Sequence, residues 1–237
     1  MKLLAIETAT TCLSVAVLDG ERVLARTDLA APGQHAKYLV PAIDDLFRSS
    51  GLTLSKLDGV AVSSGPGSFT GLRVGLATAI GFRMAAGLPL AMVPSLEAMA
   101  WNLRGAHQPL CPIFKSRTGE VYWALYQWTA SGMLQCLAGE QVGSPVMMAE
   151  SLNGRAVVFG EGWEANTKEL RRMFEKRNQR VDEAPPEANR ASAVSVGLAG
   201  HERLVRGDIA GQGISPRYVQ RAEAELMMER RAGRSGP

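Results

Sequence analysis

Histidine is scarce in this chain, and its scarcity limits the chemistry that the sequence can carry. The 237 residues include three histidines, His35, His107 and His201, which lie far apart, and no two have the spacing H-x-x-x-H. A catalytic zinc or iron centre usually draws on closely spaced histidine, cysteine and carboxylate ligands. The sequence therefore predicts no metal ligand and gives no support to a metal-dependent hydrolase.

Two common catalytic loops are also absent. No segment reads G-x-x-x-x-G-K-[ST], the phosphate loop of many nucleotide-binding proteins. Ser68 lacks the G-x-S-x-G context of a nucleophile elbow, because Pro66 stands two residues before it. We therefore predict no catalytic residue from local motifs.

Cysteine and long apolar runs are in short supply. Cys12, Cys111 and Cys136 are odd in number and widely spaced, so we expect small buried hydrophobic residues in a reducing cytosol rather than a disulfide framework. The longest apolar helical stretch lies between Arg73 and Arg83 and is too short to cross about 30 Å of hydrocarbon. A cytoplasmic protein without a membrane partner is expected.

Charge of one sign is not in excess either. Lys and Arg number 26 against 23 Asp and Glu, a net charge of +3, which is too small to indicate a nucleic-acid-binding stripe. Arg230, Arg231 and Arg234 lie close to the C-terminus, where we expect a disordered, solvated tail rather than an RNA site. Composition alone thus points to no nucleic-acid partner.

What the sequence does contain is a regular alternation of strands and helices. Hydrophobic periodicity predicts an antiparallel start, with Asp19-Gly20 as a hairpin turn, and then alternating helices and strands. The expected strands cover residues 3–6, 13–18, 22–29, 60–62 and 90–93, and the expected helices cover residues 35–48 and 70–86, with a third helix capped by Ser95. This order places all five strands in one sheet of an α/β fold.

A second lobe is expected after a hinge at residues 104–112, which contain glycine and proline. We therefore divide the chain into domains at residues 1–104 and 105–237. In the second domain the pattern predicts strands at 113–116, 121–128 and 156–159, helices at 165–177 and 191–206, and an irregular segment at 182–186.

A loop of glycine and proline joins the strand at 60–62 to the helix at 70–86. Gly65, Pro66 and Gly67 allow the backbone to approach a neighbour closely, and free N–H groups at the helix start offer a site for an anion. A tight strand-to-helix connection is the simpler interpretation, because the loop matches no standard phosphate-binding motif.

Four ordered motifs, taken together, resemble the bacterial TsaB family. They are LAIETAT at residues 4–10, Gln34-His35 followed by Leu39-Val40-Pro41, SGPGSFTGLR at 64–73 and VPSLEA at 93–98, while RTGEVY at 117–122 adds a match in the second lobe. The resemblance implies an actin-like ASKHA fold of two lobes, each with a mixed sheet and flanking helices. It also implies a role beside TsaD and TsaE in forming threonylcarbamoyladenosine on tRNA.

The same resemblance argues against catalysis by this chain. In the catalytic relative TsaD, two metal-binding histidines lie four residues apart, and Ser95 and Met99 stand at the positions that resemble them. Serine is a poor metal ligand, and a methionine thioether is too soft for a hard cation. We expect a noncatalytic subunit without a tightly bound cofactor; a nucleotide at the subunit complex and direct contact with tRNA stay open.

The cleft between the lobes offers weaker candidates. Glu7 and Thr8 stand where related nucleotide-binding proteins have their first phosphate loop, but no glycine follows before Gly20. For Thr8 and Thr10, turn formation is the simpler interpretation. Lys115 and Arg117 could meet a phosphate, although exposed hairpin charges need no ligand. A nucleotide-dependent phosphotransferase of the same fold and a metallopeptidase remain as alternative functions.

The helix at 70–86 is apolar around most of its circumference, so one face can cover the sheet while another meets a partner. Burial inside one lobe is the alternative. In the TsaB family the first two helices bundle with matching helices of TsaD, and the same surface can pair two TsaB chains. The resemblance thus implies a homodimer that TsaD displaces. The candidate interface residues are Leu39, Ile43, Gly71, Leu72, Gly75, Leu76 and Ala79.

Overall fold

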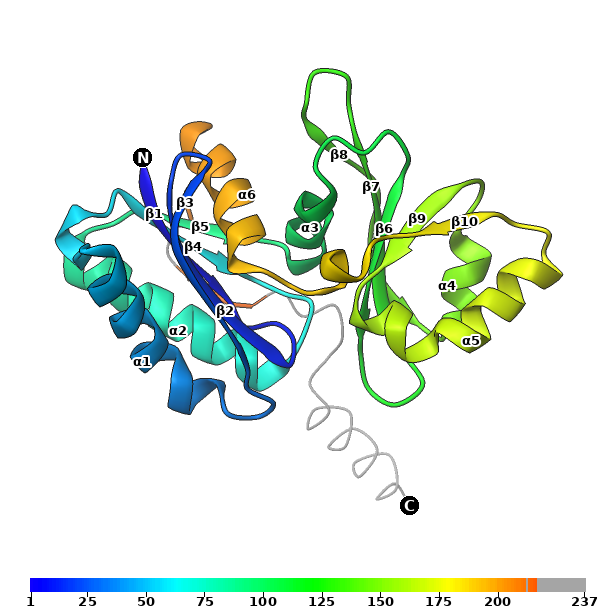
Figure 1. The fold of residues 1–237 in the computed structure, drawn as a ribbon, viewed down its shortest axis with the longest axis horizontal. Coiled ribbons are helices and arrows are strands. Elements are labelled where there is room, and N and C mark those ends of the chain that lie inside the picture. Colours follow the sequence, from blue (N-terminus) through cyan, green and yellow to red (C-terminus); the bar gives the residue numbers. More distant parts are fainter. Residues whose placement is uncertain (212, 217–237) are drawn as a thin grey trace, which may run out of the picture.

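The computed structural model describes residues 1–211 and 213–216, which form two lobes placed side by side (Figure 1). Each lobe contains a five-stranded mixed sheet with helices packed against it. The arginine-rich end of the sequence lies outside the described residues, so the expectation of a disordered tail stays a prediction. Within the described part of the chain, no helix is both long enough and apolar enough to cross a membrane.

The N-terminal sheet has the strand order β3-β2-β1-β4-β5. Its strands are β1 (Lys2–Glu7), β2 (Cys12–Asp19), β3 (Arg22–Ala30), β4 (Gly59–Ser63) and β5 (Leu90–Val93). Strand β2 is antiparallel to both β1 and β3, whereas β4 is parallel to both β1 and β5. The predicted single sheet is confirmed, because β1 and β4 lie in its middle, are buried on both faces and read as short apolar runs.

Helices cover both faces of this sheet. On one face lie α1 (His35–Ser50) and α2 (Phe69–Ala86), with a short 3-10 turn, η1 (Leu54–Lys56), between them in sequence. On the other face lies α6 (Ala193–Val205), which contacts all five strands. The approach is so close that a Cβ at Gly200 would lie 2.4 Å from the Ala61 Cβ.

The position of α6 corrects the predicted domain division. Figure 1 shows α6 at the N-terminal sheet, although it comes near the end of the described chain. The N-terminal lobe therefore contains residues 193–205 in addition to the first part of the chain. Sequence order could not reveal this, because an apolar helix at 191–206 fits either sheet equally well.

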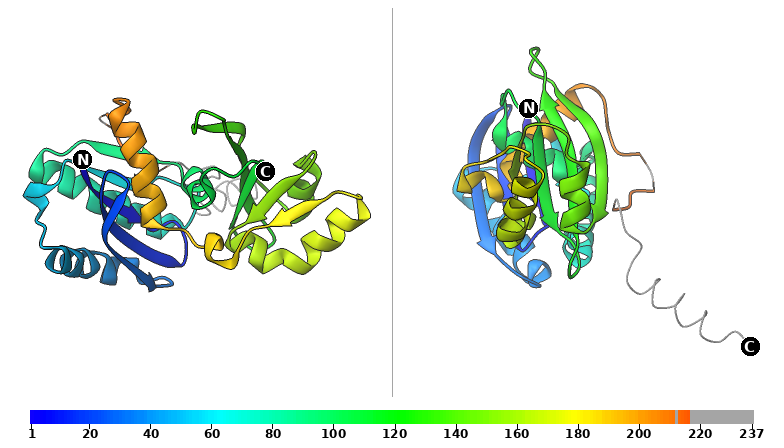
Figure 2. Two further views of the ribbon diagram at one scale, coloured as in Figure 1. Left: turned by 45° about the horizontal axis from the view of Figure 1, so that its top comes forward. Right: turned by 90° about the vertical axis from the view of Figure 1, so that its right-hand side faces the viewer.

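The C-terminal sheet has the order β10-β9-β6-β7-β8. Its strands are β6 (Leu110–Lys115), β7 (Val121–Trp128), β8 (Leu134–Gly143), β9 (Ala156–Phe159) and β10 (Val181–Glu183). Two helices, α4 (Pro145–Ser151) and α5 (Glu161–Lys176), cover one face. The other face meets α3 (Ser95–Ala100) and the turn η2 (Trp101–Leu103), which lie between the two sheets (Figure 2).

Several local expectations differ from the structure. Pro94 caps α3, while Ser95 is its first helical residue. The strand β8 and the helix α4 were not predicted, because β8 carries exposed and mixed side chains along the sheet edge. The segment at 182–186 contains most of β10 and the start of the turn η3 (Pro186–Asn189). Burial of the cysteines holds only for Cys111, since Cys12 is half-buried and Cys136 is exposed.

Candidate functional site

The glycine loop after β4 joins three parts of the N-terminal lobe. The Ser68 N–H donates to the Ala9 carbonyl at 2.6 Å. Ser95 exchanges two bonds with Gly65: its N–H donates to the Gly65 carbonyl at 2.7 Å, and its hydroxyl accepts from the Gly65 N–H at 3.0 Å. A Cβ at Gly67 would lie 2.3 Å from the Ala9 carbonyl oxygen. The fold itself thus explains the loop as a tight connection.

Gly71 and Gly75 of α2 serve the same local packing. A Cβ at Gly71 would approach the Thr8 carbonyl oxygen to 2.1 Å, and a Cβ at Gly75 would approach the Thr8 Oγ1 to 2.2 Å. The Ser68 hydroxyl also accepts from the Gly71 N–H at 3.2 Å, which caps the helix. The small residues therefore let α2 approach the turn after β1 in its own lobe.

The predicted interface residues need a corresponding correction, because all of them are buried within the chain. Ala79 has no exposed surface. Leu72 packs into a hydrophobic cluster that includes residues of both lobes. The other four apolar residues pack into the cluster between these helices and their own sheet; they are Leu39, Ile43, Leu76 and Ala79. When a helix is apolar on all sides, its sequence does not show which side faces the sheet. In the structure, α2 directs these side chains into the protein interior. Any partner contact of α1 and α2 must use other residues.

The outward sides of these two helices carry exposed apolar side chains. We call Val40 of α1 together with Phe69, Ala77, Gly81 and Met84 of α2 the outer face. The side chains of Met84 and Val40 are 79% and 55% exposed, and Phe69 is 38% exposed; Ala77 and Gly81 are also exposed. Exposed apolar side chains on two adjacent helices offer a surface that another protein can cover.

The cleft candidates occupy different environments. The Thr10 Oγ1 accepts from the Cys12 N–H at 3.2 Å, which confirms Thr10 as a turn former. Thr8 is fully buried, and its hydroxyl has no hydrogen-bond partner among the described residues. Arg117 pairs with Glu120 at 2.8 Å within the β6–β7 turn. The structure thus places Thr8 and Thr10 close together after β1, whereas Arg117 forms an ion pair within the hairpin that carries it.

Glu7, at the end of β1, is a buried acid that local motifs did not select. It is 1% exposed. Its Oε1 accepts from the Ala9 N–H at 2.5 Å and from the Ser63 hydroxyl at 3.2 Å, while its Oε2 has no partner among the described residues. Burial, with a smaller contribution from the charge of Glu161, raises the pKa of Glu7 to about 7. The only signal in the sequence was an acid ending an apolar strand.

The raised pKa of Glu7 makes stability depend on pH. The folded chain binds the Glu7 proton more tightly than the unfolded chain does, so the stability present below the ordinary pKa of 4.5 falls as pH rises through about 7. The loss approaches about 3 kcal/mol. We expect Glu7→Gln to flatten the dependence of the unfolding free energy on pH between these values, measured by urea denaturation. An unchanged slope would contradict the assignment of the buried proton to Glu7.

A cavity of about 300 Å³ opens between the lobes next to these groups. Its lining includes Thr10, Glu161, Glu164, Asn189 and Arg190. The Asn189 amide joins two chain segments, because it accepts from the Gly160 N–H at 2.7 Å and donates to the Glu164 Oε1 at 3.0 Å. Burial also raises the pKa of Glu161. The lining sets three carboxyl groups, those of Asp28, Glu161 and Glu164, against one arginine, which makes this cavity a poor site for a polyphosphate unless a cation comes with it.

Lys115 and the two positions that resemble metal ligands complete the site. Lys115 ends β6 as an exposed residue whose charge faces Glu161. Ser95 is fully buried and forms hydrogen bonds with Gly65. Met99 is also buried, and its sulfur lies 3.7 Å from the Asn102 amide nitrogen. Both positions thus take part in packing. Among the described residues, no three histidine, cysteine, aspartate or glutamate side chains gather as metal ligands would.

Comparisons with known proteins can now be set beside this geometry. A family model described as TsaD, tRNA N6-adenosine threonylcarbamoyltransferase, matches residues 29–228. The tRNA threonylcarbamoyladenosine biosynthesis protein TsaB of Escherichia coli K12 is 38% identical over 171 residues, which cover 70% of this chain and 73% of that protein. This chain belongs to the TsaB family. The match to the TsaD model shows in addition that the sequence is similar to that family over most of its length.

Solved structures extend the likeness over both lobes. YeaZ from Pseudomonas aeruginosa superposes with a TM-score of 0.75 at 27% identity, covering 92% of this chain and 99% of that chain. The ethanolamine utilization protein EutJ from Carboxydothermus hydrogenoformans has a TM-score of 0.53 at 13% identity, covers 84% of this chain and 90% of that chain, and shows the fold alone. The predicted architecture of two lobes, each with a mixed sheet and flanking helices, is confirmed, and YeaZ shares it.

Proposed function

We propose that this chain is a noncatalytic scaffold subunit that pairs with TsaD, and with TsaE, in the transfer of threonylcarbamoyl to adenosine in tRNA. Family membership supports the pathway, because the Escherichia coli relative is named for threonylcarbamoyladenosine biosynthesis. The observation that carries the scaffold role is the exposed apolar outer face, which includes Met84 with 79% of its surface exposed. The buried Ser95 and Met99 support the absence of catalysis.

Gly81 strengthens the proposal that a partner helix covers the outer face. Glycine inside a helix is less favourable than alanine by about 1 kcal/mol. At Gly71 and Gly75 the packing explains the glycine, because a Cβ at either position would clash with Thr8. At Gly81, by contrast, a Cβ would meet nothing within 4 Å. Its own lobe gives no reason for a missing side chain there. A neighbouring helix that packs closely against Gly81 supplies one.

Gly81→Ala should therefore separate stability from pairing. At a concentration at which the isolated chain is monomeric, it should gain up to about 1 kcal/mol of unfolding free energy, a rise of about 2–4 °C in Tm, while its affinity for TsaD falls. Gly75→Ala is the matched control, because its Cβ clashes with Thr8 and should lower Tm. Differential scanning calorimetry and a titration with TsaD provide the measurements. A destabilised Gly81→Ala chain, or one that pairs as well as the wild type, would count against close helix packing.

The proposal includes neither a tightly bound metal nor a cofactor held by this chain alone. Glu161 and Glu164 line the interlobe cavity and oppose the phosphates of a nucleotide. A nucleotide at the subunit complex is compatible with the proposal, since TsaD can add its own groups and a cation there. The protein acts in the cytoplasm in this account, where its partners and tRNA meet.

Pairing can be tested by light scattering on the purified chain and on its mixture with TsaD. We expect a homodimer of the chain alone and a heterocomplex that replaces it, since both contacts use the outer face. A heterocomplex that leaves the homodimer contact intact would contradict a shared surface.

Two assays separate the alternative functions from the scaffold. A phosphotransferase of the same fold would turn over ATP with a small acceptor in the absence of TsaD. A metallopeptidase would retain a stoichiometric metal in a tag-free preparation and lose activity on chelation. The scaffold proposal requires that the chain alone does neither.

A further inference from the structure

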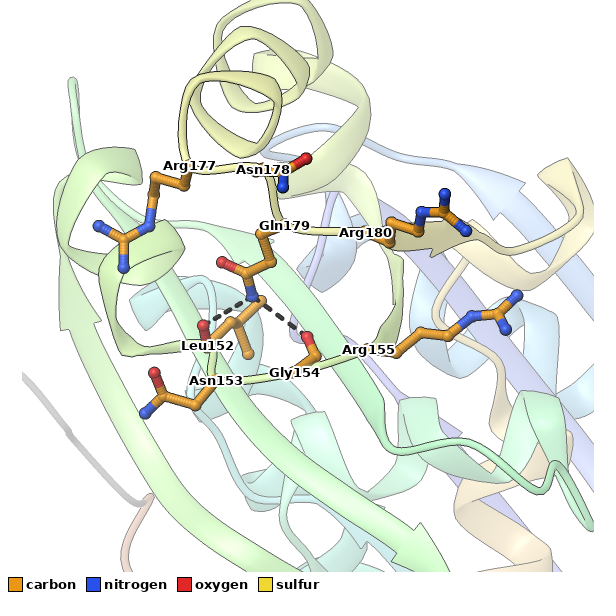
Figure 3. A pocket seen from close by; sticks show the side chains of 8 residues that line it. All are labelled: Leu152, Asn153, Gly154, Arg155, Arg177, Asn178, Gln179 and Arg180. Carbon is orange, nitrogen blue, oxygen red and sulfur yellow. Dashed lines mark hydrogen bonds between the residues drawn. The ribbon is translucent and has the colours of Figure 1, made fainter.

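A hollow at the end of the C-terminal lobe carries positive charge that the proposed scaffold role does not use. It has a volume of about 770 Å³ and lies between two segments, residues 152–155 before β9 and residues 177–180 after α5 (Figure 3). The two segments are tied together by Gln179, whose Nε2 donates to the carbonyl groups of Leu152 at 2.6 Å and Gly154 at 3.2 Å. The hollow therefore has a defined shape.

Three arginines surround this hollow, and two of them have no acidic partner. Arg155 forms two bonds with Asp182, at 2.7 Å and 3.2 Å. Arg177 and Arg180 are exposed, and neither forms an ion pair with any described residue. In Figure 3 their side chains project from the two ends of the same turn, with Arg155 on the facing segment. The charges of Arg177 and Arg180 are thus available to a ligand.

The hollow lies far from the other candidate surfaces. In the C-terminal sheet β6, β9 and β10 are parallel. Glu161 and Asn189, which line the interlobe cavity, come after the carboxyl ends of β9 and β10, whereas residues 152–155 and 177–180 precede their amino ends. The outer face belongs to the other lobe (Figure 1). A ligand can occupy the hollow while a partner protein covers α1 and α2.

We propose that this hollow binds the phosphodiester backbone of RNA, and specifically of the tRNA substrate. Arginine presents a planar fork that matches phosphate oxygens. Asn153 and Asn178, also in the lining and exposed, offer amide groups for ribose hydroxyls and phosphates. The choice of RNA among polyanions rests on the proposed function. Two or three phosphate contacts position the tRNA without reading its sequence.

The test uses the full chain, an unmodified tRNA transcript and fluorescence anisotropy over a series of salt concentrations. For the double variant Arg177→Ala with Arg180→Ala we expect roughly tenfold weaker binding of tRNA at low salt. The slope of log affinity against log salt concentration should become shallower by about 1 to 2. A matched control, Arg22→Ala with Lys56→Ala, removes the same charge from exposed positions of the N-terminal lobe and should bind like the wild type. Arg177→Lys with Arg180→Lys should keep most of the binding and the helix-end charge.

Pairing with TsaD, measured separately by light scattering, should be unchanged in all three double variants. The proposal is overturned if the wild-type chain does not bind tRNA at low salt, or if the alanine variant binds like the control. Weaker pairing of the alanine variant with TsaD or TsaE, with unchanged tRNA binding, would instead assign the hollow to an acidic protein surface. Failure of the wild-type chain to pair with TsaD refutes the scaffold role but leaves the tRNA result readable.

Discussion

Ala77→Arg should abolish pairing with TsaD and tRNA modification while leaving the chain folded. Ala77 is exposed on the outer face of α2, and arginine keeps good helix propensity. The new side chain lies four residues from Arg73, which costs the isolated helix only about 0.2–0.5 kcal/mol. At a packed helix contact, however, it must separate the helices or bury an unpaired charge, which weakens a complex by roughly 100-fold or more.

The comparison for this variant is Ala165→Arg, the same change at an exposed position of α5 in the other lobe. Calorimetry at a concentration at which the chain is monomeric should give nearly the same Tm for both variants. Analytical ultracentrifugation with TsaD should show a complex for Ala165→Arg and none for Ala77→Arg. If Ala77→Arg pairs with TsaD as tightly as the wild type does, the outer face is not the surface that contacts TsaD.

Ala79→Arg, two residues further along the same helix, should unfold the protein. Ala79 has no exposed surface and packs with Leu76, Leu39 and Ile43 between the helices and the sheet. An arginine there leaves a buried charge without a partner, at a cost of about 3–5 kcal/mol, which is a large share of the 5–15 kcal/mol typical of a folded domain. Tm should fall by about 10 °C or more.

Circular dichroism during heating provides the measurement for this pair of variants. The structure predicts a low Tm for Ala79→Arg and a normal Tm for Ala77→Arg. A stable Ala79→Arg chain that fails to pair would mean that α2 is rotated about its axis relative to the orientation described here.

The contrast between Ala77 and Ala79 illustrates what the sequence could predict. The five strands of one sheet followed from hydrophobic periodicity, because β1 and β4 are buried runs of apolar residues between clear turns. Periodicity could not predict which side of α2 packs against the sheet, because apolar residues surround the helix. Only tertiary contacts, such as those of Gly75 with Thr8, decide which side is inside.

The charged features were hidden for a different reason. A net charge of +3 averages over 49 charged residues, so it does not reveal that Arg177 and Arg180 share one hollow with Arg155. The loops that carry them are far apart in sequence and meet through Gln179. Glu7 likewise gained its raised pKa from burial beneath the glycine loop, which motif matching does not measure.

The most direct test of the noncatalytic scaffold is an omission series in a reconstituted reaction. The chain is mixed with its TsaD and TsaE counterparts, threonylcarbamoyl-adenylate and tRNA, each protein is omitted in turn, and threonylcarbamoyladenosine in the tRNA is measured by mass spectrometry of nucleosides. We expect no product without TsaD and little or none without this chain. Product formed when TsaD is omitted, or undiminished product when this chain is omitted, would contradict the scaffold role.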